Sequence, residues 1–421
     1  VELQANTIAT VLAQKLKASY RQLYVPDSVS EDILNSILKE DVGVRAVVDV
    51  IKGNINPSGR LSDTFAYDLN SAPSTENDGN YVYQTDPGIE LPESEGKKNR
   101  FNTYMVYQEG IYIGYRYYET RYEDLVFGVH SADSTKGAKN SGTDGWSYEK
   151  EVAFPFGYGD SYTKFEYSGF KATQDDKKNV KVEVTVKNTG SVSGKEVVQV
   201  YLQKPYTDYD VTNKVEKASV ELVGYTKTSL LEAGKSETVS IDIPYENFKT
   251  YDANGHKTYI IEEGDYYLTV ANDAHNAINN IIAKKDASKK TNAKFVNKYM
   301  GNYVRNNTAA LNEDFAKVFN LQEDFETFSK STQTGEVITN QFDQGDINKY
   351  TNRGDNSVVY LSRNNWNTTY PSTPSLSLNA DMIKDLNPDA TPDDTGLTMP
   401  NYSKFKSPCE DKKPRHKTGL K

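Results

Sequence analysis

The sequence predicts a mainly β protein, in which an antiparallel β-sandwich follows a partial α/β region and precedes an irregular polar tail. Apolar and polar side chains alternate over Val180–Val186 and over Val239–Ile243, which is typical of strands with one buried face. The stretch Val197–Leu202 is apolar enough for a central strand. Turn signals near Asn188 and Asn254 separate such stretches. Because several short strands follow one another with no helix expected between them, a sandwich is favoured.

The region before the sandwich is predicted to begin with helices over residues 1–53, which Gly53 and Pro57 end. Residues 66–103 are rich in Asn, Asp, Ser, Pro and Gly, so we expect a long surface connection. The polar stretch Ser131–Ser147 is expected to be a solvent-exposed loop. The helical prediction depends on apolar residues at three- and four-residue spacing, namely Ile8, Val11, Leu12, Leu16, Tyr20, Leu23, Ile33, Leu34, Ile37 and Leu38.

Composition limits the classes of partner. The 421 residues carry a formal net charge of -10, which argues against nucleic acid or an anionic membrane surface as the main partner. No stretch reaches the roughly 18 apolar residues that span a bilayer. With one cysteine, Cys409, and four histidines far apart, we expect no internal disulfide, no metal site and no cofactor. The chain begins at Val1 without a visible leader, so it looks like a piece of a longer protein, and either a cytoplasmic or a secreted location is compatible with it.

The stretch Glu109–Gly128 contains five tyrosines and one phenylalanine among charged residues. The alternation of Ile111 and Ile113 with the first tyrosines suggests an extended strand with a packed face. Tyrosine has an apolar ring and a polar tip, so the rings suit either packing between two domains or an aromatic floor for sugars. The sugar-contact candidates are Tyr112, Tyr115 and, in the tail, Trp366, although a lone loop tryptophan can equally anchor its loop.

Three segments in order carry a family resemblance: VVDVIKGNINPSGRLSDTF (47–65), YQEGIYIGYRYYE (107–119) and FPFGYGDSYTKFEYSGF (154–170). They resemble glycoside hydrolase family 3, in which such segments close the α/β-sandwich domain, cross between domains and start the fibronectin type III-like domain. The following stretch, VTVKNTGSVSGKEVVQVYL, is similar to that domain's pattern. The resemblance runs from about residue 44 to about residue 275, and it implies a fibronectin type III-like identity for the predicted sandwich.

The resemblance implies a domain division. Residues 1–65 would be a helical remnant at the end of the α/β-sandwich domain, and residues 66–165 a connector with the tyrosine-rich crossing segment. Residues 166–282 would form the fibronectin type III-like sandwich. Residues 283–421 would be a bridging tail, partly disordered because it has little apolar surface. Its stretch Thr334–Pro371 resembles a bridging region of family members with permuted domain order, in which the barrel comes last.

Family 3 enzymes resemble retaining glycosidases, which need two carboxyl groups about 5 Å apart. The resemblance implies an Asp nucleophile in an SDW-like motif on a (β/α)8 barrel, and this motif is absent from the sequence. Asp63 follows a serine but lies in the segment that closes the α/β domain, so we do not expect it to be the nucleophile. Residues 1–43 hold no convincing equivalent of the acid/base Glu. Whether the chain is an enzyme stays open, with Glu109 and Glu119 as the catalytic candidates and Asp160 as a further carboxylate.

The functional expectation is a portion of a β-glucosidase-like family 3 hydrolase that lacks the barrel nucleophile. Its parent would cleave O-glycosidic bonds in plant-type β-glucosides, and the portion would contact a (β/α)8 barrel that is not present in this chain. The alternative is a non-catalytic carbohydrate-binding or structural accessory module. These classes differ in whether sugar is turned over, bound without turnover, or not bound.

Overall fold

The computed structural model describes residues 42–78, 81–82, 84–85, 103–289, 313–321, 325–332, 334–340, 346–350, 358–372 and 376–378. These residues form two compact units. The first comprises the described residues of Val1–Glu76, Tyr107–Asn340 and Val359–Ser372, and the second those of Asn77–Val106, Gln341–Val358 and Thr373–Lys421.

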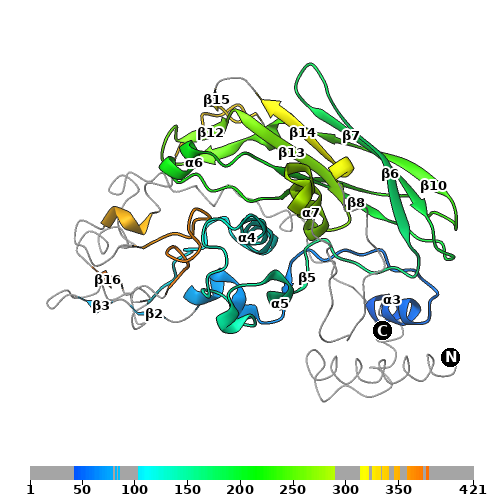
Figure 1. Ribbon diagram of the computed structural model, residues 1–421, viewed down its shortest axis with the longest axis horizontal. Helices are drawn as coiled ribbons and strands as arrows, with labels where there is room; N and C mark the ends of the chain where they lie inside the picture. Colours follow the sequence, from blue (N-terminus) through cyan, green and yellow to red (C-terminus); the bar gives the residue numbers. More distant parts are fainter. Residues whose placement is uncertain are drawn as a thin grey trace, which may run out of the picture. The chain divides into compact units, whose positions relative to one another are not determined.

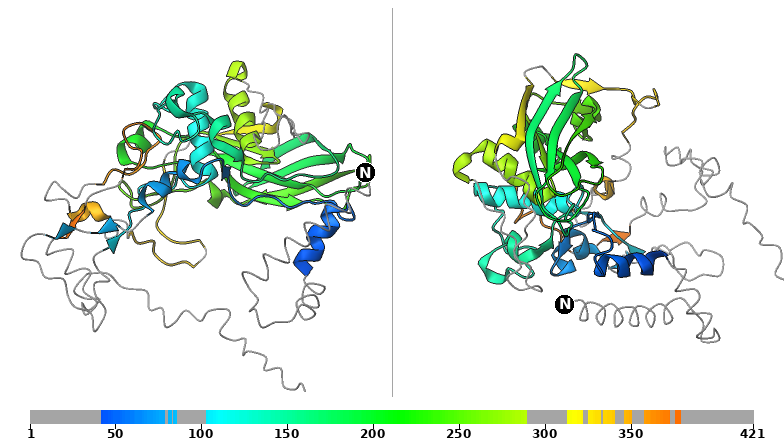
Figure 2. Two further views of the ribbon diagram at one scale, coloured as in Figure 1. Left: turned by 90° about the horizontal axis from the view of Figure 1, so that it is seen from below. Right: turned by 90° about the vertical axis from the view of Figure 1, so that its right-hand side faces the viewer.

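Two antiparallel sheets make the core of the first unit (Figures 1 and 2). One sheet has the order β10-β7-β6 and the other the order β14-β13-β8-β9. Alternate residues of β7 are buried, and apolar side chains of both sheets share one cluster, so the predicted sandwich and the strands placed by alternation are confirmed. The strands are β6 (Phe165–Gln174), β7 (Val180–Asn188), β8 (Val197–Gln203), β9 (Glu221–Lys227), β10 (Ser236–Ile243), β13 (Gly264–Ala271) and β14 (Ala316–Leu321).

A third sheet of the first unit has the order β11-β12-β15, with β11 (Thr250–Asp252), β12 (Thr258–Ile261) and β15 (Glu326–Phe328). Strands β14 and β15 come from residues of the predicted tail and pair antiparallel with β13 and β12. The tail therefore contributes regular structure to the sandwich.

Two helices lie among these strands, so the expectation of no helix between them is wrong. Helix α6 (Asp208–Asn213) follows β8, and Thr207 and Asp210 form a capping box at its start. Helix α7 (Ala274–Lys285) follows β13 and begins where the side chain of Asp273 accepts a hydrogen bond from the Asn276 backbone N–H. Capping residues at their starts thus stabilise two helices within a region whose sequence pattern predicts only strands.

The tyrosine-rich stretch is a helix, α4 (Tyr115–Phe127), so the prediction of an extended strand is wrong. Gly114 precedes it with φ 54°, and Gly128 ends it in the left-handed region, where its N–H bonds the carbonyls of the last turn. Residues 117–121, 123 and 124 are all buried, so no apolar stripe marks the helical period. Helix α4 contacts α7 (Figure 1).

The N-terminal part of the first unit supplies short elements: α3 (Val42–Ile51), β1 (Phe65–Ala66), α5 (Tyr148–Glu151) and β5 (Val152–Phe154), with β1 antiparallel to β5. Helix α3 agrees with the predicted helical region, and residues 1–41 lie outside the described residues. The smaller second unit contains β2 (Tyr81–Val82) paired with β4 (Thr103–Tyr104), and β3 (Gln84–Thr85) paired parallel with β16 (Ser377–Leu378). Its apolar cluster consists of Val106, Val358 and Leu376.

In the part of the chain that the structure describes, no helix has the length and apolar character needed to cross a membrane.

The two sheets of the sandwich approach each other closely at Gly224. A Cβ added to Gly224 on β9 would lie 2.7 Å from Ile243 Cδ1 and 2.9 Å from Ile241 Cγ2, both on β10. We expect Gly224→Val to lower the free energy of unfolding by about 1–3 kcal/mol through overpacking. Urea unfolding measures this, with Gly59→Val as control, because nothing lies within 4 Å of a Cβ at Gly59. Equal losses in the two variants would contradict the close approach.

Candidate functional site

Most of the predicted site residues lie where several segments of the first unit meet around α4. We call this region the α4 junction and define it as residues 107–147, which include α4, together with residues 214–220. The segment 359–370 lies far beyond the sandwich in the sequence, yet it packs beside α4 (Figure 1). The junction and this segment therefore come from three separate stretches of chain.

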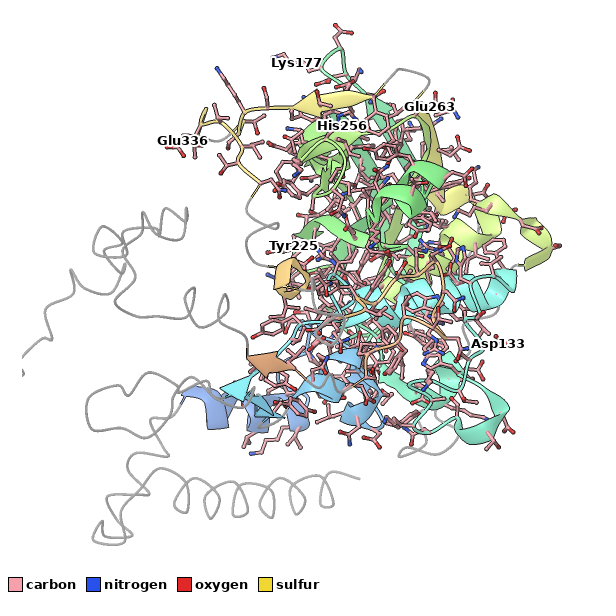
Figure 3. The ribbon with its side chains drawn as sticks, turned by 90° about the vertical axis from the view of Figure 1, so that its left-hand side faces the viewer. Asp133, Lys177, Tyr225, His256, Glu263 and Glu336 are labelled. Atoms are coloured by element: carbon pink, nitrogen blue, oxygen red, sulfur yellow. The ribbon has the colours of Figure 1, made fainter. Side chains whose placement is uncertain are left out.

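Arg121 holds the 129–147 loop. Its side chain is fully buried and donates to the carbonyls of Ala132 (2.9 Å), Ser134 (2.7 Å) and Lys136 (2.7 Å). The guanidinium also lies 4.9 Å from the ring centroid of Trp146, a cation–π distance. Asp133, labelled in Figure 3, is exposed, whereas the carbonyls on either side of it bond Arg121.

Glu151 holds the other end of the same loop. Its Oε1 accepts from the backbone N–H groups of Asn140 (2.9 Å) and Ser141 (2.7 Å) and from the Ser141 hydroxyl (2.7 Å), and its side chain is fully buried. The prediction of a solvent-exposed loop is thus wrong for its buried residues, which include Ser141 and Trp146. The physical reason is that two buried charges of α4 and α5 bind its backbone.

Glu123 and Asp124 form an acidic pair in the last turn of α4. Lys285 Nζ lies 2.7 Å from Glu123 Oε1, while Arg363 Nη2 lies 2.5 Å from Asp124 Oδ1 and 3.3 Å from Glu123 Oε2. Gln203 also donates to Glu123. Burial would raise the pKa of Glu123, but Lys285 and Arg363 lower it to about 2. Glu123 is therefore charged, and two cations lie beside the acidic pair.

Tyr112 and Trp366 lie in the interior of the junction, each with 0% exposure. The Tyr112 hydroxyl donates to Glu216 Oε2 (2.5 Å), and Trp366 Nε1 donates to Asp124 Oδ2 (2.8 Å). Their ring centroids are 5.1 Å apart in an edge-to-face arrangement. This placement favours packing over sugar contact for both rings, and the sugar-contact expectation stays a prediction.

Tyr115, the third ring in that expectation, is half-buried at the start of α4. Its ring stacks on Phe156 with centroids 4.4 Å apart, and its hydroxyl accepts from the Leu222 backbone N–H (3.1 Å). Because one ring face and the hydroxyl are engaged, the residue joins α4 to β9.

Glu119 is fully buried beside two aromatic side chains. Its Oε1 accepts from the Tyr148 hydroxyl (2.5 Å), and its Oε2 lies 2.8 Å from His275 Nδ1. The His275 and Tyr148 rings stack with centroids 3.9 Å apart. Burial raises the pKa of Glu119, although His275 and Tyr148 act in the opposite direction. Both carboxylate oxygens are thus committed to side chains of the protein.

Glu109 lies before α4 and is 3% exposed. Its backbone carbonyl accepts from the Tyr112 N–H (3.0 Å), and its Oε2 has no hydrogen-bond partner among the described residues. Burial raises the pKa of Glu109. In the described part of the chain no hydrogen bond or ion pair joins Glu109 to Glu119, so the two catalytic candidates are not brought together by a shared interaction.

The remaining carboxylates have local roles. Asp63 Oδ1 accepts from the backbone N–H of the next residue (2.7 Å), and Asp160 Oδ2 accepts from the Tyr158 hydroxyl (2.7 Å). Both are exposed. Among the described residues, no group of three or more His, Cys, Asp or Glu side chains could hold a metal ion.

The charged residues that organise the junction were not predicted from the sequence. Arg121, Glu123, Asp124 and Arg363 carry no motif, and Arg363 lies about 240 residues from its partners Glu123 and Asp124. One signal was available, since Arg116 and Glu119 carry opposite charges and are three residues apart, a spacing that stabilises a helix. Applied to the tyrosine-rich stretch, that spacing would have favoured a helix.

Two family models match separate segments of the chain. The model for "Glycosyl hydrolase family 3 C-terminal domain" matches residues 5–115, and that for "Fibronectin type III-like domain" matches residues 196–274. The chain is therefore similar to glycoside hydrolase family 3 over these two segments, which match in that order along the sequence.

Several curated proteins are similar to the chain. Beta-glucosidase A of Butyrivibrio fibrisolvens is 33% identical over 243 residues, which cover 54% of this chain and 23% of the relative. Beta-glucosidase of Ruminococcus albus is 32% identical, with 54% and 19% covered. Exo-alpha-(1->6)-L-arabinopyranosidase of Bifidobacterium longum is 30% identical, with 62% and 27% covered. The chain therefore spans between 19% and 27% of the length of these three relatives.

Among solved structures, beta-glucosidase 3B of Thermotoga neapolitana in complex with alpha-D-glucose is 28% identical to the chain. The match covers 68% of this chain and 27% of that structure, with a TM-score of 0.42.

Proposed function

We propose that the chain is the non-catalytic part of a family 3 glycoside hydrolase whose parent cleaves β-glucosides. In this role the sandwich and the α4 junction brace a (β/α)8 barrel carried by residues outside this chain. The names of two similar proteins, both beta-glucosidases, support the substrate class. The short share of each relative that the chain spans supports a barrel elsewhere in the parent.

The observation that carries the proposal is the state of the two catalytic candidates. A retaining glycosidase needs a nucleophile and an acid/base that both reach the sugar. Both oxygens of Glu119 bond side chains of the protein, and Glu119 has 0% exposure. Glu109 is 3% exposed. Neither carboxylate is presented as a catalytic group would be, which supports a bracing role.

Turnover of an aryl β-glucoside, with an aryl β-xyloside in parallel, tests this proposal on the purified chain. We expect no rate above buffer, and no change in Glu109→Gln or Glu119→Gln. Reproducible turnover that co-purifies with the chain and falls at least a hundredfold in either variant would contradict the proposal. Binding of glucose by calorimetry, without turnover, would instead support the carbohydrate-binding alternative, with Tyr115→Ala as the first variant to test.

A further inference from the structure

The segment Val359–Ser372 belongs to the first unit, although the residues on both sides of it belong to the second. The amide of Leu361 donates to the Gln108 carbonyl (2.7 Å), and the amide of Trp366 donates to the His130 carbonyl (2.9 Å). The Gln108 side chain returns a bond to the Val359 carbonyl (3.0 Å). Backbone hydrogen bonds thus hold the start and the middle of the segment on the α4 junction.

The segment also has an internal structure of its own. The Thr369 hydroxyl donates to the carbonyl of Ser362 (3.0 Å) and accepts from the Ser362 amide (3.0 Å). The Asn365 side-chain oxygen accepts from the backbone amides of Asn367 and Thr368, at 3.1 Å each. These bonds close a compact loop that does not depend on the surface beneath it, and a preorganised loop loses less conformational entropy when it docks.

Without this segment the acidic pair of α4 would keep Lys285 beside Glu123 but would lose Arg363, which contacts both carboxylates. Negative charge in the last turn of a helix faces the negative end of the helix dipole. Glu123 and Asp124 lie there and are each 2% exposed. Arg363 meets both, and its guanidinium also lies 5.0 Å from the ring centroid of Tyr206. Its own amide donates to Glu216 Oε2 (3.1 Å). The surface is therefore built for a cation that approaches from another part of the chain.

Next to the acidic pair lies an aromatic slot. Trp366 fills it with 0% exposure, and its indole N–H donates to the second oxygen of Asp124. The ring centroids of Tyr112 and Tyr117 lie 5.1 Å and 5.7 Å from Trp366. The Asp124 carboxylate thus binds two side chains of the segment, Arg363 at Oδ1 and Trp366 at Oδ2. We call these two side chains the anchors.

We propose that the α4 junction is a peptide-binding site for a segment of the type Arg-x-x-Trp, and that its occupant is residues 359–372 of the same chain. We call this segment the clasp. Its docking neutralises the acidic pair and fills the aromatic slot, and it thereby ties the chain beyond the sandwich back to α4. The inference does not depend on the proposed glycosidase function, because it rests only on contacts within the first unit.

A nicked form of the full chain tests the clasp. A specific protease site replaces residues 341–345, and the cleaved protein is passed through gel filtration. We expect the two fragments to stay together, because the clasp remains docked and because β16 remains paired with β3 in the second unit. Arg363→Ala and Trp366→Ala should each release the C-terminal fragment at least tenfold faster, since either removes one anchor on Asp124. Asn364→Ala is the matched control, because Asn364 is exposed within the same loop.

The milder variant Asp124→Asn covers the case in which an anchor variant fails to fold. It keeps the size of the side chain but weakens both anchors together, so we expect at least tenfold faster release for it as well. Circular dichroism of the uncut protein establishes that each variant is folded. Immediate separation of the nicked wild-type fragments would overturn the proposal. Release rates of all folded anchor variants equal to that of Asn364→Ala would also overturn it.

Discussion

Replacing Arg121 with methionine is expected to lower the free energy of unfolding by about 3–5 kcal/mol, because the buried guanidinium binds three backbone carbonyls that would lose their donor. Each unsatisfied buried acceptor costs about 1–3 kcal/mol. The cation–π contact with Trp146 is lost as well. Methionine has a similar length and no charge, so the variant removes the donors while keeping most of the volume.

Urea unfolding measures the effect, and the same helix offers the control. Arg116 lies on α4 but is exposed, so Arg116→Met should change the free energy of unfolding by less than about 0.5 kcal/mol. Arg121→Lys should also destabilise, since one ammonium group cannot reproduce the planar fork that reaches three carbonyls. A cost of Arg121→Met no larger than that of Arg116→Met would show that the 129–147 loop does not depend on this side chain.

The strands of the sandwich could be predicted because their burial follows their sequence period. In β7, residues 180, 182, 184 and 186 are buried and the residues between them are not, so alternation in the sequence matches alternation in space. The same argument found β10 from Val239 to Ile243. Where one face of a strand is buried and the other is exposed to water, the hydrophobicity pattern of the sequence is enough to predict the strand.

The α4 junction could not be predicted in this way because its buried side chains are polar. Glu119, Arg121 and Asp124 have exposures of 2% or less, and each is balanced by a partner that hydrophobicity does not mark. The partners of Asp124 lie about 240 residues further along the chain, and a single sequence contains no signal for contacts at that separation. The interactions of the candidate residues therefore came only from the structure.

Replacing Lys217 with methionine is expected to lower the free energy of unfolding by about 3–5 kcal/mol at pH 8, because Lys217 belongs to a second buried ionic cluster. Lys217 Nζ contacts both Glu262 Oε2 and Asp210 Oδ2, the latter at 2.8 Å, and the three side chains are 3% exposed or less. Without the cation, two buried carboxylates face each other. Thermal or urea unfolding measures the loss, and Lys195→Met, at an exposed lysine, is the control.

The pH dependence distinguishes this electrostatic cause from lost packing. Burial raises the pKa of Asp210 to about 7, with Lys217 opposing and Glu262 adding to the shift. A carboxyl group whose pKa is raised by folding contributes stability that is complete below its unfolded pKa, about 3.8, and is lost as the pH rises through about 7. The free energy of unfolding of the wild type should therefore fall by about 2 kcal/mol between pH 5 and pH 8 relative to that of Asp210→Asn, in which residue 210 cannot titrate.

The free energy of unfolding of Lys217→Met should fall more steeply between pH 5 and pH 8 than that of the wild type. In this variant no cation offsets the repulsion between the two carboxylates, and protonation of one of them at pH 5 relieves that repulsion. Its cost relative to wild type is therefore expected to shrink as the pH falls from 8 to 5. If the cost were the same at both pH values, lost packing of the lysine stem would be its cause, and the two carboxylates would not be coupled through Lys217.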